Sequence, residues 1–163
     1  MRDAGDLVDA VLREIRLHAG VSRARQRPEP DEAPYQVVVV DDDECTRVLY
    51  AEALRGLGFR VRAAAGAFES LALARAHRPD IIVMDYSMPG ADGGQAVRML
   101  DEEPRSRGIP VVMVTASLEL VPKDTRTRCA AVIAKPCAVD ELAYLLRLVI
   151  DACGEKPPDV VAR

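Results

Sequence analysis

Residues 80–93, with the sequence DIIVMDYSMPGADG, decide the fold of this chain. An apolar run over residues 81–84 ends at a single carboxylate, Asp85, and a Pro-Gly turn and an Asp-Gly pair follow it. A continuous apolar run bounded by turn residues is typical of a strand that is covered on both faces, and so of a parallel sheet. Asp85 is then expected at the carboxyl end of the strand, where open α/β sheets bind their ligands.

From Gln36 onward, apolar runs alternate with amphipathic segments. Strands are predicted at residues 37–40, 59–64, 81–84, 110–114 and 131–134. Helices are predicted from the apolar stripe Cys45, Val48, Leu49 and Ala53, at 68–76 and 94–100, weakly at 118–129 around Pro122, and at 142–150. Successive β-α units predict an α/β fold with a parallel sheet, right-handed crossovers and helices on both faces.

The first 34 residues have a different composition from the rest. Residues 4–19 predict an amphipathic helix, with acids at its start and Arg toward its end. The following stretch is rich in Arg, Pro and acids and predicts a linker. The predicted organisation is therefore an extension at 1–34, a globular domain at 35–152 and a short tail at 153–163.

Composition argues against several classes of protein. The formal net charge of -4 disfavours a nucleic-acid binder, which is usually basic. No apolar run approaches the roughly 18 residues of a membrane span, and acids near the N-terminus argue against a signal peptide. The four cysteines have no CxxC or His-Cys metal spacing. We therefore expect a cytoplasmic protein whose reduced thiols serve as small core residues.

Polar residues with complementary chemistry follow four of the predicted strands. They are Asp41 and Asp42, Asp85, Thr115 and Lys135. Carboxylates crowded at one sheet edge repel each other unless a cation lies among them, and oxygen ligands favour Mg²⁺. An Asp85 oxygen could then attack phosphorus, with Lys135 and Thr115 binding the phosphoryl oxygens.

The segments VVVVDDDE, DIIVMDYSMPGADG, PVVMVTA and AKP resemble, in this order, the receiver domain of two-component response regulators. The resemblance extends over residues 36–152. It implies a flavodoxin-like, doubly wound sheet of five parallel strands in the order 2-1-3-4-5. The implied function is a module that takes a phosphoryl group from a sensor histidine kinase or phosphotransfer protein, without turnover of an external substrate.

The resemblance also implies a role for each polar residue. Asp85 would be the phosphoacceptor, Thr115 the switch hydroxyl and Lys135 the lysine that pairs with the phosphate. The implied Mg²⁺ ligands are Asp41 and Asp42, with Asp42 the direct ligand of this pair, Asp85, and the backbone carbonyl of Ser87. We expect no further domain after the last helix, so the signal would pass to an unknown downstream protein rather than to nucleic acid or a membrane.

Three departures from the family pattern affect the expected signalling face. Val132 stands three positions before Lys135, where the family commonly has an aromatic residue, and Arg128-Cys129 replaces the usual Gly-Ala step. The interval between Thr115 and Lys135 is also short. Val132 is stiff about χ1 and has no ring to rotate. We therefore expect phosphorylation to move the loop at 115–116 and the segment around Pro122.

Two other readings of the same residues remain open. The chain could be a receiver-like interaction module that phosphorylation does not regulate. It could also be a haloacid-dehalogenase-like phosphatase, because residues 41–45 fit that family's D-x-D pattern. Such a phosphatase needs another acidic pair on a strand after Lys135, and the sequence predicts only a helix and a tail there. Uptake of phosphate from a small donor would distinguish the phosphoacceptor from the unregulated interaction module. Turnover of a phosphate ester would identify the phosphatase.

We predict that the apolar stripe of the extension mediates homodimerisation or docking. The stripe consists of Leu7, Val8, Val11, Leu12 and Ile15. Burying it would contribute roughly 25 cal/mol per Å² of apolar surface. Deleting residues 1–30 should convert a dimer to a monomer when the molar mass is measured in solution. A full-length protein that is monomeric at high concentration would contradict the dimer.

Overall fold

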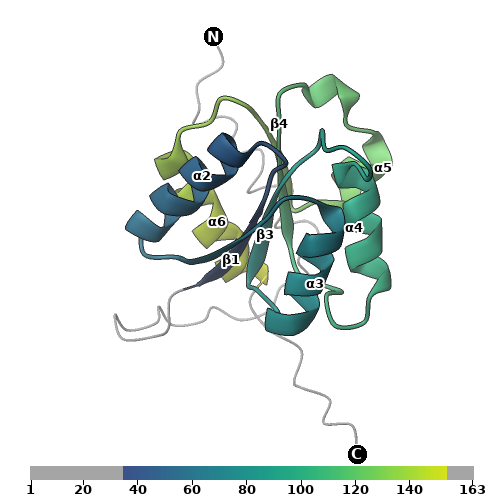
Figure 1. Cartoon of the computed structure of the whole chain (residues 1–163), viewed down its shortest axis with the longest axis horizontal. Helices are drawn as coiled ribbons and strands as arrows, with labels where there is room; N and C mark the ends of the chain where they lie inside the picture. Colours follow the sequence, from purple (N-terminus) through teal and green to yellow (C-terminus); the bar gives the residue numbers. More distant parts are fainter. Residues whose placement is uncertain (1–34, 154–163) are drawn as a thin grey trace, which may run out of the picture.

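A computed structural model of the chain describes residues 35–153 (Figure 1). The predicted extension at 1–34 and residues 154–163 of the predicted tail lie outside the described residues, whereas Cys153 is the last residue of α6. The strands are β1 (Gln36–Val40), β2 (Arg60–Ala64), β3 (Ile81–Asp85), β4 (Val111–Thr115) and β5 (Ala131–Ala134). The helices are α2 (Glu44–Gly56), α3 (Ala67–His77), α4 (Gly93–Glu102), the 3₁₀ turn η1 (Leu118–Leu120), α5 (Lys123–Arg128) and α6 (Val139–Cys153).

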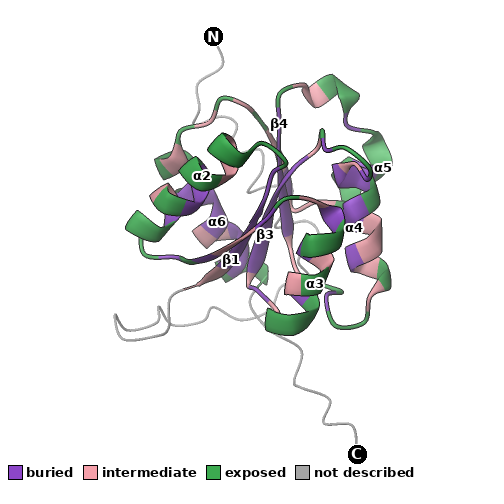
Figure 2. Ribbon diagram, viewed as in Figure 1, coloured by how far each residue is buried: buried purple, intermediate pink, exposed green. Residues whose placement is uncertain are grey.

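The strands form one five-stranded parallel sheet in the order β2-β1-β3-β4-β5. This confirms the predicted flavodoxin-like fold and strand order. Helices cover both faces of the sheet, so the central strands β3 and β4 are buried along their whole length (Figure 2). Because all strands run in the same direction, their carboxyl ends lie at one edge.

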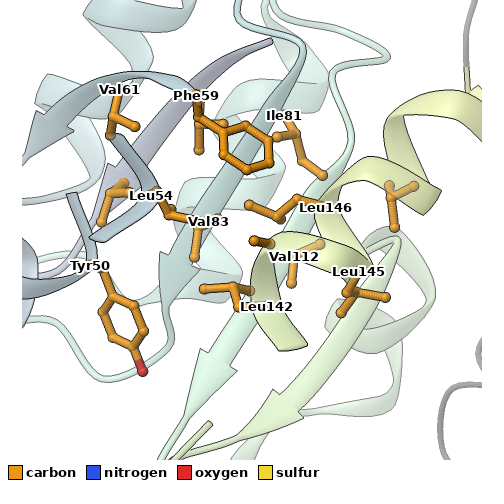
Figure 3. Close-up of a cluster of buried hydrophobic side chains, with 14 of the residues drawn as sticks. Tyr50, Leu54, Phe59, Val61, Ile81, Val83, Val112, Leu142, Leu145 and Leu146 are labelled. Carbon is orange, nitrogen blue, oxygen red and sulfur yellow. The ribbon is translucent and has the colours of Figure 1, made fainter. Parts of the chain in front are cut away.

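Each face of the sheet has its own hydrophobic core. Alternate residues of β1 point to opposite faces, so that Val37 and Val39 belong to one core and Val38 and Val40 to the other. The first core lies beneath α2 and α6 and consists largely of branched and aromatic side chains, with the α6 leucines facing the strands (Figure 3). The second core, beneath α3 and α4, is built mainly from alanine, methionine and valine.

The inward face of α2 differs from the predicted stripe. The structure confirms the helix but buries Tyr50, Ala51 and Leu54, whereas Val48 and Leu49 are 51% and 63% exposed. Tyr50 accounts for the error, because its ring packs in the first core while its hydroxyl lies 3.4 Å from the Cys137 sulfur. A tyrosine can thus lie in a core when its polar end reaches a partner.

The expectation that the cysteines serve as core residues is wrong for Cys45 and Cys153, whereas Cys137 packs against the first core and Cys129 against the second. All four are free thiols, and none of them is fully buried. Cys45 and Cys153 are exposed, and Cys129 and Cys137 are half-buried. Cys45 lies on the first turn of α2, on its solvent side, so its apolar character does not lead to burial.

The weak helical segment at 118–129 is divided in two. Pro122 separates η1 from α5 and is itself the N-cap residue of α5, with an extended backbone. Proline has no amide hydrogen for a helix interior but is tolerated at a helix start, which explains the division. Among the described residues, no helix is both long and apolar enough to cross a membrane.

The Asp-Gly pair at 92–93 attaches α4 to the end of β3. Asp92 accepts a hydrogen bond from the Gln95 amide at 2.8 Å, and the Gln95 side chain accepts one from the Asp92 amide. This capping box satisfies two amides at the helix start. The Gly93 amide donates to the Tyr86 carbonyl at 2.8 Å, so the first turn of α4 lies directly against the segment that carries Asp85.

We predict that Gly93→Ala destabilises the fold. A Cβ atom there would lie 2.8 Å from the Asp85 carbonyl oxygen and 2.9 Å from the Tyr86 Cα. Both are backbone atoms, which cannot move away without distorting the main chain. The free energy of unfolding should therefore fall by about 1–3 kcal/mol, as measured in urea titrations. Gly56→Ala is the control, because nothing lies within 4 Å of its added Cβ. It should stabilise the protein by about 0.4–1 kcal/mol. Equal stability of the two variants would contradict the close approach at Gly93.

Candidate functional site

The predicted site residues lie at the carboxyl edge of the sheet. Asp85 is the last residue of β3 and Thr115 the last of β4. Asp41 and Asp42 follow β1 directly, and Lys135 follows β5. Parallel pairing places these strand ends side by side, with Asp85 opposite Val114 and Thr115 opposite Ala134.

Three carboxylates form a compact cluster at this edge. Asp41, Asp42 and Asp85 each offer an oxygen atom, and these oxygens lie within 4.8 Å of one another. Asp41 and Asp85 are only 4% and 7% exposed, whereas Asp42 is exposed to solvent. An all-oxygen donor set that combines buried carboxylates with an accessible one fits Mg²⁺, which takes one or two carboxylates and keeps several waters.

Lys135 bridges two of these carboxylates. Its Nζ atom donates to Asp41 Oδ2 at 2.8 Å and lies 3.1 Å from Asp85 Oδ1. Burial alone would lower the pKa of Lys135, but the hydrogen bonds and charges of Asp41 and Asp85 outweigh it and raise the pKa above its usual value. The Lys135 side chain therefore stays protonated near neutral pH.

The electrostatic environment of Asp85 favours a nearby cation. Burial raises the pKa of Asp85 above its usual value. The hydrogen bond and charge of Lys135 oppose this shift, whereas the charges of Asp41 and Asp42 add to it. Any further positive charge at the cluster would stabilise the ionised form of Asp85.

The loop after β1 is fixed by contacts that sequence reasoning missed. Arg47 donates from Nη1 to the Asp41 carbonyl at 2.8 Å, and the Asp43 amide donates to Asp41 Oδ1 at 2.9 Å. Asp43 caps α2 by accepting from the Thr46 amide, and this hydrogen bond lowers the pKa of Asp43. The sequence did hold one indication of the Arg47 contact. Arg47 lies in the first turn of α2, where a positive charge interacts unfavourably with the helix dipole, and this suggests a local hydrogen-bond partner.

Thr115 and Ser87 occupy different environments. Thr115 is 1% exposed, and its hydroxyl accepts from the Ser117 amide at 3.2 Å and lies 3.4 Å from the Ser117 carbonyl. The hydroxyl is therefore engaged with its own loop. Ser87 is exposed two residues after Asp85, and the role of its carbonyl as a metal ligand stays a prediction.

Comparison with known proteins agrees with this geometry. The family model described as the response regulator receiver domain matches residues 37–147. The chain belongs to the response regulator receiver family. It is 34% identical over 109 residues to the polar-differentiation response regulator DivK of Brucella anthropi, an alignment that covers 65% of this chain and 88% of DivK. Receiver domains are signalling modules, and the family assignment favours the receiver reading of residues 41–45 over the phosphatase reading.

Solved receiver structures superpose on the same part of the chain. A putative response regulator from Chloroflexus aurantiacus has a TM-score of 0.65 at 28% identity and covers 72% of this chain and 98% of its own. The receiver domain of a Pseudomonas aeruginosa sensor histidine kinase has a TM-score of 0.66 at 27% identity, with the same coverage. The latter structure holds a magnesium ion coordinated in its active site cleft.

We predict that Asp42→Asn weakens Mg²⁺ binding by at least about tenfold, because it removes a charged oxygen ligand from the cluster. Asp43→Asn is the matched control. It removes a neighbouring exposed charge, and Asn remains a good N-cap for α2. Mg²⁺ affinity measured by isothermal titration calorimetry should change little in the control. Equal losses in both variants would mean that overall charge, rather than ligation by Asp42, governs binding.

Proposed function

We propose that the protein is a phosphoacceptor signalling module in which Asp85 takes a phosphoryl group from a histidine kinase or phosphotransfer protein. The observation that carries this proposal is the placement of Asp85 between an ammonium group and two further carboxylates. Lys135 contacts both Asp85 and Asp41, and Asp42 completes the cluster on the solvent side. The donor set supports Mg²⁺ as the ion, held by Asp41, Asp42, Asp85 and the Ser87 carbonyl.

The transfer forms one bond and breaks another. A carboxylate oxygen of Asp85 attacks the phosphorus atom, and the bond from phosphorus to the donor's imidazole nitrogen breaks. The other ring nitrogen of the donor is protonated in this step, so that a neutral imidazole leaves. Lys135 is placed to offer its ammonium group to the phosphoryl oxygens. Mg²⁺, when bound, neutralises the developing negative charge. The Thr115 hydroxyl can donate to the phosphoryl group once it leaves Ser117.

The module signals through contacts with a downstream protein and turns over no external substrate. Its phosphoryl donors are made from ATP inside the cell, so we place the reaction in the cytoplasm. The rival function is an interaction module that phosphorylation does not regulate. The same four charged side chains, Asp41, Asp42, Asp85 and Lys135, favour the phosphoacceptor, because a purely structural module has no need to crowd carboxylates at a sheet edge.

We predict that acetyl phosphate with Mg²⁺ adds one phosphoryl group to the protein, measured by intact mass spectrometry. Asp85→Asn should abolish the gain, because the amide is not a nucleophile for this transfer. Asp43→Asn, which alters an adjacent carboxylate outside the cluster, should retain it. Uptake by Asp85→Asn at the wild-type rate would refute the assignment of Asp85, and an unmodified wild-type protein would favour the unregulated module.

A further inference from the structure

The segment that follows β4 engages the Thr115 hydroxyl through Ser117. The backbone of Thr115 is fixed by the sheet, because its carbonyl accepts from the Lys135 amide at 2.7 Å. Its hydroxyl is engaged by Ser117. To donate to a phosphoryl group on Asp85, the hydroxyl must turn its hydrogen away from the Ser117 carbonyl, either by rotating or by moving with residues 116–117. The freedom of residues 117–121 therefore controls how easily the hydroxyl reorients.

One arginine of α5 ties down this segment at both ends. Arg126 donates from Nε to the Val121 carbonyl at 2.9 Å, and its Nη2 donates to the Leu118 carbonyl. Leu118 is the first residue of η1 and Val121 follows its last, and a planar guanidinium with several donors can bond to both carbonyls at once. Arg126 is exposed, so these contacts do not depend on burial of its side chain.

The helix that carries Arg126 is itself fastened to α4. Thr125 is 1% exposed and packs against Gly94, where a Cβ would lie 2.8 Å from the Thr125 hydroxyl. Two ion pairs join the same helices, Arg98 to Asp124 at 3.5 Å and Arg128 to Asp101 at 2.9 Å. Because α5 is only six residues long, the buried Thr125 contact anchors it, and the two exposed ion pairs add little. Arg126 thus connects the segment after β4 to a fixed support.

Val132 offers no alternative route for the signal. It is half-buried at the edge strand β5 and has no ring to move between buried and exposed positions. The segment after β4 follows Thr115 directly in the chain and is the route that we consider for this coupling. Arg126 is the side chain whose hydrogen bonds bracket η1 in that segment.

We propose that Arg126 is a positioning residue that holds residues 117–121 in the resting arrangement and opposes the turn of the Thr115 hydroxyl toward Asp85. The inference rests on the proposed function, because it assumes that a phosphoryl group at Asp85 recruits that hydroxyl. A group bound at Asp85 shifts the equilibrium only by its preference for the second arrangement. Removing contacts specific to the first arrangement therefore strengthens binding at Asp85.

The test compares Arg126→Met with Arg128→Met. Both remove an exposed guanidinium from α5, but Arg128 pairs with Asp101 and does not touch the segment after β4. Binding of beryllofluoride, an aspartyl-phosphate mimic, is titrated with Mg²⁺ present and followed by ¹⁹F NMR. Arg126→Met should bind about tenfold more tightly than wild type, as expected from the loss of charge-assisted hydrogen bonds. Arg128→Met should stay within about twofold of wild type, as expected for an exposed pair.

Hydrogen exchange without beryllofluoride supplies a second readout. Arg126→Met should speed exchange at residues 117–121 and leave exchange at residues 131–150 unchanged. Arg126→Lys keeps the charge but loses the planar guanidinium, so its exchange rate at residues 117–121 should lie between those of wild type and Arg126→Met. If wild type binds beryllofluoride and Arg126→Met binds it no more tightly, the inference is overturned, even if exchange in the variant is faster. An equal gain in affinity in Arg128→Met overturns it as well. Failure of the wild-type protein to bind beryllofluoride overturns the proposed function, and the inference with it.

Discussion

The site depends on the attraction of one ammonium group for two buried carboxylates that would otherwise repel each other. Lys135 follows β5 and Asp41 follows β1, and β3 and β4 lie between these strands in the sheet. Only a long side chain can span that distance, and Lys135 reaches Asp41 and Asp85 together. The parallel sheet, its strand order and the Lys135 amide bond to Thr115 all contribute to this contact. The cost of burying Asp41 and Asp85 is thereby offset before any metal binds.

The two cores differ in composition. Beneath α2 and α6, branched and aromatic side chains predominate (Figure 3). Beneath α3 and α4, alanines and valines are joined by methionines such as Met84 and Met113. Methionine is unbranched and adapts to small shifts of its neighbours. Rearrangement after phosphoryl transfer is therefore more easily accommodated on the face that carries α4 and α5, where Thr115 is followed by η1.

The sequence predicted the fold and the polar edge because both follow local patterns. Apolar runs ending at Asp41, Asp85 and Thr115 mark strand ends whatever the tertiary contacts are. The apolar pattern did not predict the buried face of α2, because Tyr50 is both apolar and polar. Its ring is buried in the first core while its hydroxyl reaches Cys137. The pattern also gave no sign of the bonds that Arg126 makes to backbone carbonyls. Such bonds depend on where the chain folds back, and almost any arginine in a short helix has the same local sequence character.

The placement of the cysteines makes the protein suited to spectroscopic labelling. Cys45 is an exposed thiol on the first turn of α2, beside the loop that carries Asp42, whereas Cys153 is exposed at the far end of α6, toward the opposite edge of the sheet. Burial raises the pKa of Cys129 to about 12, which keeps it largely unreactive. Partial burial of its sulfur also raises the pKa of Cys153, so this thiol should react more slowly than its exposure suggests. The chain has no tryptophan. A fluorophore on Cys45 would therefore be free of native indole emission and would report on the pocket, while the same dye on Cys153 would serve as a distant reference.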